Sequence, residues 1–148
     1  MLKIFIKIRN YFLIKKYPFI ECRNVWNNSK IDHKYEYTWL DDLPKGWRKR
    51  FGEDICKDLK SLFTQIDSID FSDKYKITQI KEKYGQLRWY DTGVPTVISE
   101  QYDEVMQKYE ELSEHTCTVC GKSGYIDYND YWLEPLCDKH RNKSIKFR

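Results

Sequence analysis

The sequence predicts an α+β protein in which a small antiparallel hairpin packs with two to three helices and a cysteine-rich C-terminal module follows. Two long stretches repeat apolar residues at steps of three or four, which is typical of amphipathic helices. Two segments rich in β-formers flank Tyr84-Gly85, which predicts a hairpin. Residues 117–148 hold closely spaced cysteines and a histidine, which indicates a separate small module.

Size and composition are those of a globular protein. A chain of 148 residues can form one core of ordinary size with a small appendage. Hydrophobic residues make up 41% and aromatic residues 16%, which argues against disorder. Only 4 prolines and 6 glycines are present, so we expect no flexible linker.

The first element is a predicted helix that Pro18 ends. Basic residues interrupt its apolar run every few positions, which excludes a transmembrane span and disfavours a signal peptide. On a helical projection one face carries the apolar side chains of Ile4, Phe5, Ile8 and Phe12, with Lys3 and Lys7 opposite. We expect this helix to dock on the body. Binding to a membrane surface or to a partner protein are the alternatives, and a membrane is the less expected partner.

Residues 35–40 alternate and are rich in β-formers, so they predict a short strand. Asp41-Asp42-Leu43-Pro44 is typical of a helix start. The helix that follows has an apolar stripe that we assign to the core: Trp47, Phe51, Ile55, Leu59, Leu62 and Phe63. A loop is expected over residues 66–73.

Residues 75–83 and 86–90 are the two predicted strands, because Gly85 supplies the positive φ of a tight turn. Thr96 or Ser99 is expected to cap a second long helix. Its predicted core stripe is Ile98, Tyr102, Val105, Met106, Tyr109 and Leu112. This helix runs directly into Cys117, so we predict a body of residues 1–116 and a module of residues 117–148 packed on it.

The module contains a Cys-x2-Cys pair and a Cys-x2-His pair separated by sixteen residues: Cys117, Cys120, Cys137 and His140. Thiolate and imidazole are the usual ligands of zinc, and four of them complete its tetrahedral shell. The sequence therefore predicts one structural Zn²⁺, with no position left for a catalytic water. A redox-active Cys117–Cys120 pair is disfavoured, because it leaves Cys137 and His140 without a role.

The elements around these ligands resemble a treble-clef zinc finger. Residues 117–121 fit a zinc knuckle, residues 124–128 and 131–134 can form a hairpin, and a basic helix follows Cys137. Some treble clefs are HNH-type nucleases with further histidines on the hairpin and helix. Here the other histidines are His33 and His115, outside both elements, so a nuclease is disfavoured. The sequence contains no Ser/His/Asp constellation and no phosphate-binding glycine loop, so an enzyme is less expected than a binding protein.

A second motif is Lys-Glu-Lys-Tyr-Gly-Gln-Leu-Arg-Trp-Tyr at residues 81–90. Together with Cys-x2-Cys-Gly and the Trp…Cys-x2-His ending, it resembles a family of small bacteriophage and mobile-element proteins to which no activity is assigned. The resemblance spans roughly residues 44–140. It implies an intracellular, phage-like context, consistent with reduced cysteines in the host cytoplasm.

The same string has a structural and a functional interpretation. In the structural one, Leu87 and Trp89 face the core while the charged residues form cross-strand pairs. In the functional one, the hairpin and the terminal helix offer basic and aromatic side chains to single-stranded nucleic acid. The residues of this candidate surface, for nucleic acid or another partner, are Lys81, Lys83, Arg88, Trp89, Lys139, Arg141, Lys143 and Lys146.

Charge is distributed unevenly along the chain. Residues 1–30 hold seven basic side chains and one acidic one, whereas the middle of the chain is acidic and the net charge is only +3. Dedicated nucleic-acid-binding proteins are often more basic. The leading hypothesis is therefore a non-catalytic, zinc-stabilised binding protein that acts on a host protein, such as a defence or transcription component. Nucleic-acid binding is the first alternative and a zinc-finger nuclease the second.

Overall fold

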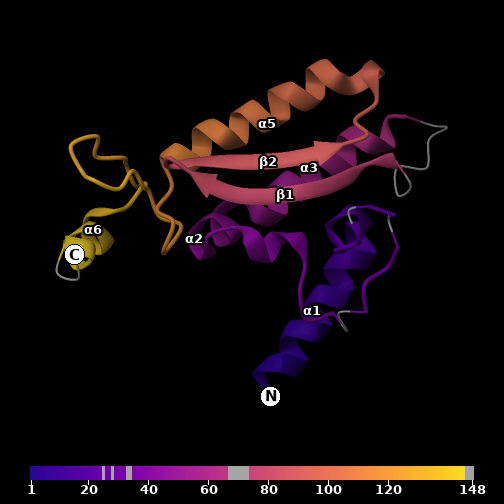
Figure 1. Ribbon diagram of the computed structural model, residues 1–148, viewed down its shortest axis with the longest axis horizontal. Coiled ribbons are helices and arrows are strands. Elements are labelled where there is room, and N and C mark those ends of the chain that lie inside the picture. Colours follow the sequence, from indigo (N-terminus) through magenta and orange to yellow (C-terminus); the bar gives the residue numbers. More distant parts are fainter. Residues whose placement is uncertain (25, 28, 33–34, 67–73, 146–148) are drawn as a thin grey trace.

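The computed structural model describes residues 1–24, 26, 27, 29–32, 35–66 and 74–145, with the backbone alone for 142–145. It confirms the α+β class: helices and a two-stranded antiparallel sheet precede the cysteine-rich C-terminal segment (Figure 1). In chain order the main elements are α1 (Leu2–Lys16), α2 (Lys45–Trp47), α3 (Glu53–Thr64), β1 (Lys76–Lys83), β2 (Gln86–Thr92), α5 (Ser99–Glu114) and α6 (Asp138–Ile145).

The predicted central helix forms as α2 and α3, joined by a π-helical turn at Arg48–Gly52. The whole predicted stripe from Trp47 to Phe63 is buried, as the spacing of three and four residues requires. The Trp47 and Phe51 rings lie 6.0 Å apart at the centre of the core. This helix is therefore the element around which the rest of the body packs.

The hairpin also forms as predicted, with β1 and β2 paired antiparallel. Tyr84 and Gly85 have φ of 54° and 83°, the two positive values that a type I′ turn needs. Ile80, Leu87 and Trp89 point into the core. The side chains that alternate with them lie on the opposite face of the sheet.

Helix α5 packs against both β2 and α3 (Figure 1). Tyr102, Met106 and Tyr109 of its predicted stripe are buried. At the α3 contact, Asp58 accepts hydrogen bonds from Lys108 Nζ at 2.8 Å and Tyr109 Oη at 2.6 Å. No side-chain cap forms at the start of α5; instead Ser99 Oγ donates to the carbonyl of Thr96.

The strand predicted at residues 35–40 is wrong. Trp39–Asp42 is a 3₁₀ turn, and Thr38 and Asp41 form a capping box at its start. The Thr38 backbone N–H donates to Asp41 Oδ2 at 2.7 Å, so Asp41 caps this turn and not the long helix. Of the expected loop at 66–73, residues 67–73 lie outside the described part of the chain.

The expected docking of α1 is correct for only half of the helix. Asn10, Ile14 and the following Tyr17 are buried in the body, and Asn10 Nδ2 donates to the carbonyl of Tyr35 at 2.9 Å. The face of Ile4, Phe5, Ile8 and Phe12, predicted to pack on the body, is exposed instead. The helix has apolar residues on both sides, and the body covers only one. Within the described ranges, none of the helices has the length and apolarity needed to cross a membrane.

Candidate metal centre

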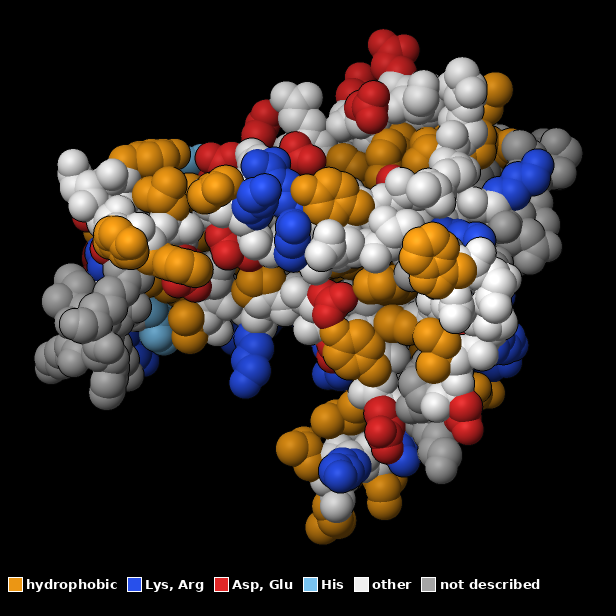
Figure 2. Space-filling model, viewed as in Figure 1, with side chains coloured by type: hydrophobic (Ala, Val, Ile, Leu, Met, Phe, Trp, Pro, Cys, Tyr) orange, Lys and Arg blue, Asp and Glu red, His pale blue; other side chains and the backbone are white. Residues whose placement is uncertain are grey.

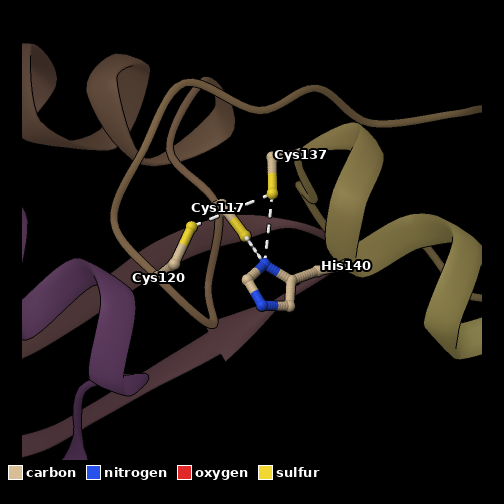
Figure 3. A group of neighbouring side chains, drawn as sticks. All are labelled: Cys117, Cys120, Cys137 and His140. Atoms are coloured by element: carbon tan, nitrogen blue, oxygen red, sulfur yellow. Dashed lines mark hydrogen bonds between the residues drawn. The ribbon is translucent and has the colours of Figure 1, made fainter.

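The four predicted ligands come together where the end of α5 meets the start of α6 (Figure 3). Cys117 and Cys120 lie in the turn that follows α5, Cys137 immediately precedes α6, and His140 is in its first turn. Their ligand atoms all lie within 4.8 Å of one another. The described residues contain no other such group of three or more His, Cys, Asp and Glu side chains.

The first ligand pair is held by a tight turn of the backbone. Cys117 N donates to the carbonyl of Lys122 at 2.8 Å, and Gly121 N donates to that of Cys117 at 3.0 Å. Gly121 has φ of 80°, a conformation that a residue without a Cβ adopts readily. The predicted knuckle is therefore present, and it directs both sulfurs toward α6.

The distances between the ligand atoms fit a single tetrahedral zinc ion. With Zn–S of about 2.3 Å and Zn–N of about 2.0 Å, tetrahedral geometry places two sulfurs about 3.8 Å apart and sulfur and nitrogen about 3.5 Å apart. Cys120 Sγ and Cys137 Sγ are 3.8 Å apart, and Cys117 Sγ lies 3.6 Å from His140 Nδ1. Cys137 Sγ is closer to that nitrogen, at 3.1 Å. The cluster is thus compatible with one zinc ion bound through Nδ1 of His140.

The electrostatics of the sulfurs also suit a cation. Burial would raise the pKa of Cys117, but backbone N–H groups of Cys137, Cys120 and Val119 favour the thiolate and lower its pKa to about 6. Burial and the neighbouring sulfurs raise the pKa of Cys137. The Cys117 sulfur therefore favours the thiolate form, whereas the nearby sulfurs disfavour a second negative charge on Cys137. A divalent cation at the centre relieves that repulsion.

The knuckle rests directly on α2. Gly46 N donates to the carbonyl of Thr118 at 2.7 Å, and Trp47 Nε1 donates to that of Thr116 at 2.8 Å. A Cβ placed on Gly46 would lie 2.1 Å from the Cys117 carbonyl oxygen. The sequence pattern assigns Trp47 to the core alone and gives Gly46 no role. A glycine inside an amphipathic helix is nevertheless a sign that another backbone segment packs closely against it.

The hairpin predicted between the two ligand pairs does not form as two strands. Among its residues only Tyr125 forms a bridge, with Leu136, which lies beyond the predicted second strand. Beyond it the chain turns locally, because Asp127 Oδ1 accepts a bond from Asn129 N at 3.0 Å and the Asp127 carbonyl accepts one from Asp130 N. Short polar side chains compete with strand pairing in this way.

Of the basic residues predicted on the terminal helix, Arg141 is not available to a ligand. It is buried, its guanidinium lies 4.2 Å from the centre of the Tyr125 ring, and Nη2 donates to the Tyr125 and Leu136 carbonyls. Arg141 therefore ties α6 to the loop before it. Lys139 is exposed. Lys143 lies in α6, its side chain outside the described set, and Lys146 lies outside the described residues.

The structure divides the candidate residues of the hairpin between its two faces. Trp89 is only 8% exposed and donates Nε1 to Tyr75 Oη at 3.0 Å, so its predicted role in stacking on a base is wrong. Lys81 stands opposite Arg88 on the outer face, where Lys83 is also exposed. Figure 2 shows basic side chains gathered over this end of the hairpin.

No protein-family profile, curated protein or solved structure matches this chain. The interpretation of the site therefore rests on its residues and their geometry. His115, at the end of α5, lies outside the four-residue cluster, and His33 lies outside the described residues.

Proposed function

We propose that this chain is a non-catalytic, zinc-stabilised binding protein whose partner is another protein. The observation that carries the proposal is the closed donor set of three cysteines and one histidine. Four protein ligands complete the tetrahedral shell of zinc, so the ion would stabilise the fold and offer no position to a substrate. The phage-like resemblance of the sequence supports a host protein as that partner.

The zinc-module loop, residues 121–136, is the surface that such an ion would hold in shape. It connects the two ligand pairs, so the ion closes it at both ends. Tyr128, Tyr131 and Trp132 are exposed on it, Tyr131 to 98%. Exposed aromatic side chains on a rigid support are typical of the residues that dominate protein–protein binding energy.

The charges around this loop favour a protein over a nucleic acid. Asp127, Asp130 and Glu134 belong to the loop, and Asp138 follows at the start of α6. These four carboxylates outnumber the two nearby lysines, Lys122 and Lys139, so the surface repels phosphates and complements a partner surface rich in lysine or arginine. We therefore expect the partner protein to bind the zinc-module loop with a basic surface.

The test is affinity capture from host lysate with the zinc-loaded protein as bait, followed by a purified binding assay with the recovered protein. Replacing Tyr131 and Trp132 by serine should reduce binding tenfold or more, because exposed aromatic side chains of this kind carry most of the binding energy of an interface. Both rings lie outside the core, so their loss should leave the fold intact. The double replacement Tyr84→Ser/Tyr90→Ser on the hairpin is the matched control. Binding that survives loss of the loop aromatics, or removal of the metal, would contradict the proposal.

A second candidate function is single-stranded nucleic-acid binding by the outer face of the hairpin. Lys81, Lys83 and Arg88 lie there beside the exposed rings of Tyr84 and Tyr90. The Lys81 and Lys83 ammonium groups lie 5.6 Å and 5.5 Å from the centres of the Tyr90 and Tyr84 rings. Cations beside stackable rings suit phosphates and bases.

Fluorescence anisotropy with labelled single-stranded DNA and RNA, titrated with salt, separates the two functions. Nucleic-acid binding predicts an affinity that falls steeply as salt is added. The variant Lys81→Gln/Lys83→Gln should then bind more weakly to every sequence and with a shallower salt dependence. No binding at low salt would remove this candidate and leave the protein partner.

A further inference from the structure

Helix α1 presents an apolar surface that the other described residues leave largely uncovered. Phe5 is 65% exposed and Phe12 64%, and Leu2, Ile4 and Ile8 are at least half exposed. Ile4, Phe5, Ile8, Tyr11 and Phe12 span about 120° of the helix circumference, and we call them the α1 apolar face. Contiguous apolar surface of this kind marks a binding site for a membrane or a protein.

Basic residues border the α1 apolar face on both sides. On the helical projection Lys7 lies beside one edge and Arg9 and Lys16 beside the other, with Lys3 farther round toward the opposite side of the helix. Lys15 lies within the arc at its C-terminal end, with its ammonium 5.5 Å from the centre of the Tyr11 ring. The helix contains no acidic residue. A ligand that binds this face is therefore favoured if it carries negative charge along both edges.

Three of these cations have carboxylate partners on the body, and in each pair both side chains are exposed except for the partly buried Asp41. Lys7 Nζ lies 3.2 Å from Glu36 Oε1, Lys16 Nζ 3.3 Å from Glu53 Oε1, and Arg9 Nη2 3.8 Å from an Asp41 oxygen. Exposed ion pairs are worth about 0–1 kcal/mol each. The long side chains can therefore exchange these partners for anionic groups of a ligand surface.

The body is attached to the other side of α1, so it does not block the apolar face. Asn10 and Ile14 make the buried contact, and the N-terminal turns of the helix project away from the sheet (Figure 1). Figure 2 shows hydrophobic side chains crowding this projecting end, with basic ones among them. A flat surface can thus approach the N-terminal turns of the helix, up to the point where Tyr35 packs on Tyr11.

From this arrangement we infer that α1 binds the surface of an anionic lipid bilayer. The apolar face enters the interface between headgroups and acyl chains, and the lysines on both edges reach up to lipid phosphates. A second copy of the chain fits less well, because it would place one α1 with five cations against another. This binding is independent of the proposed partner of the zinc-module loop, which lies on a different element.

Flotation of the zinc-loaded full chain with phospholipid vesicles tests the inference. One set of vesicles contains phosphatidylcholine alone and the other one third phosphatidylglycerol. We expect binding to the anionic vesicles, at least tenfold weaker binding to the neutral ones, and loss of affinity with added salt. Equal binding to both, or none to either, overturns the inference.

Variants of α1 test whether this helix is the element that binds the vesicles. Phe5→Ser/Phe12→Ser should reduce vesicle binding tenfold or more, whereas Tyr131→Ser/Trp132→Ser, which removes two other exposed rings from the zinc-module loop, should leave it unchanged. A Phe5→Trp variant, which keeps the apolar face, should show a blue-shifted emission on anionic vesicles. Sedimentation equilibrium distinguishes another occupant: self-association abolished by Phe5→Ser/Phe12→Ser, without vesicle binding, identifies a second copy and refutes the lipid surface.

Discussion

Replacing Gly46 by alanine tests whether α2 and the metal centre act as one unit. A Cβ at this position would lie 2.1 Å from the Cys117 carbonyl oxygen and 2.6 Å from Gly121 N. Both are backbone atoms of the knuckle, so they cannot move aside as a flexible side chain would. We expect α2 and the knuckle to separate by roughly 1.4 Å, the difference between 2.1 Å and an ordinary contact of about 3.5 Å.

The cost follows from the two hydrogen bonds that join α2 to the knuckle. The separation breaks the 2.7 Å bond from Gly46 N to Thr118 O and weakens the 2.8 Å bond from Trp47 Nε1 to Thr116 O. Each buried group left without a partner costs about 1–3 kcal/mol. Alanine returns about 0.5–1 kcal/mol through its better helix propensity. The free energy of unfolding should therefore fall by about 2–4 kcal/mol, which lowers Tm by about 5–15 °C for a chain of this size.

Gly52→Ala is the matched control, because Gly52 lies in the same helical segment with φ of −57°. Its new Cβ would meet side-chain atoms of Arg48 and Leu43 at 3.3 Å and 3.4 Å, which can move slightly. Thermal unfolding followed by circular dichroism, and zinc transfer to a chromophoric chelator, measure both variants. Gly46→Ala should melt well below Gly52→Ala and release zinc more readily. Equal melting temperatures and equal zinc affinities would refute the steric argument.

Three further predictions concern the ligands, the core tryptophan and one ion pair. Cys137→Ser should lose most of its zinc by metal analysis while Cys22→Ser keeps one ion per chain; full occupancy in Cys137→Ser would remove that residue from the ligand set. Trp47→Phe should lower the free energy of unfolding by about 1–3 kcal/mol in chemical denaturation, because it leaves a buried carbonyl without a donor; unchanged stability would contradict this. Partial burial of Asp58 opposes the lowering of its pKa, but bonds from its lysine and tyrosine partners on α5 prevail. The ionised Asp58 side chain therefore adds to the free energy of unfolding above the unfolded pKa of about 3.9, and this addition is lost as pH falls through the lower folded pKa. Asp58→Asn should cost a few tenths of a kcal/mol at pH 7 and nothing at pH 2, as chemical denaturation at the two pH values would show.

The parts of the fold that the sequence predicts correctly are those with a local cause. The stripe from Trp47 to Phe63 needs only the helical period, and the turn at Tyr84 and Gly85 needs only the residues that tolerate positive φ. The clustering of the three cysteines and His140 belongs to the same class, because Cys-x2-Cys and Cys-x2-His each fit within one turn of backbone. The three predictions therefore required no knowledge of how distant segments pack.

The predictions that are wrong depended on contacts between distant segments or on competition from polar side chains. Periodicity shows that α1 has an apolar face with Phe5 and Phe12, but it cannot show which side the body covers. β-formers at residues 35–40 and 124–134 suggested strands, yet Asp41 and Asp127 accept nearby backbone N–H groups and form turns. Trp89 followed strand alternation into the core, which the structural interpretation of the hairpin had anticipated.

The position of Trp47 links metal binding to the core of the body. Its ring is fully buried between Phe51 and the rest of the core, while its Nε1 donates to the residue that precedes Cys117. If zinc occupies the cluster, its removal should free the knuckle and withdraw the Thr116 carbonyl from a buried donor. We therefore expect chelation to change the near-ultraviolet circular dichroism of the core aromatic residues and to lower Tm of the whole chain. A chelated protein with unaltered near-ultraviolet signal and Tm would show that the metal centre and the body are energetically separate.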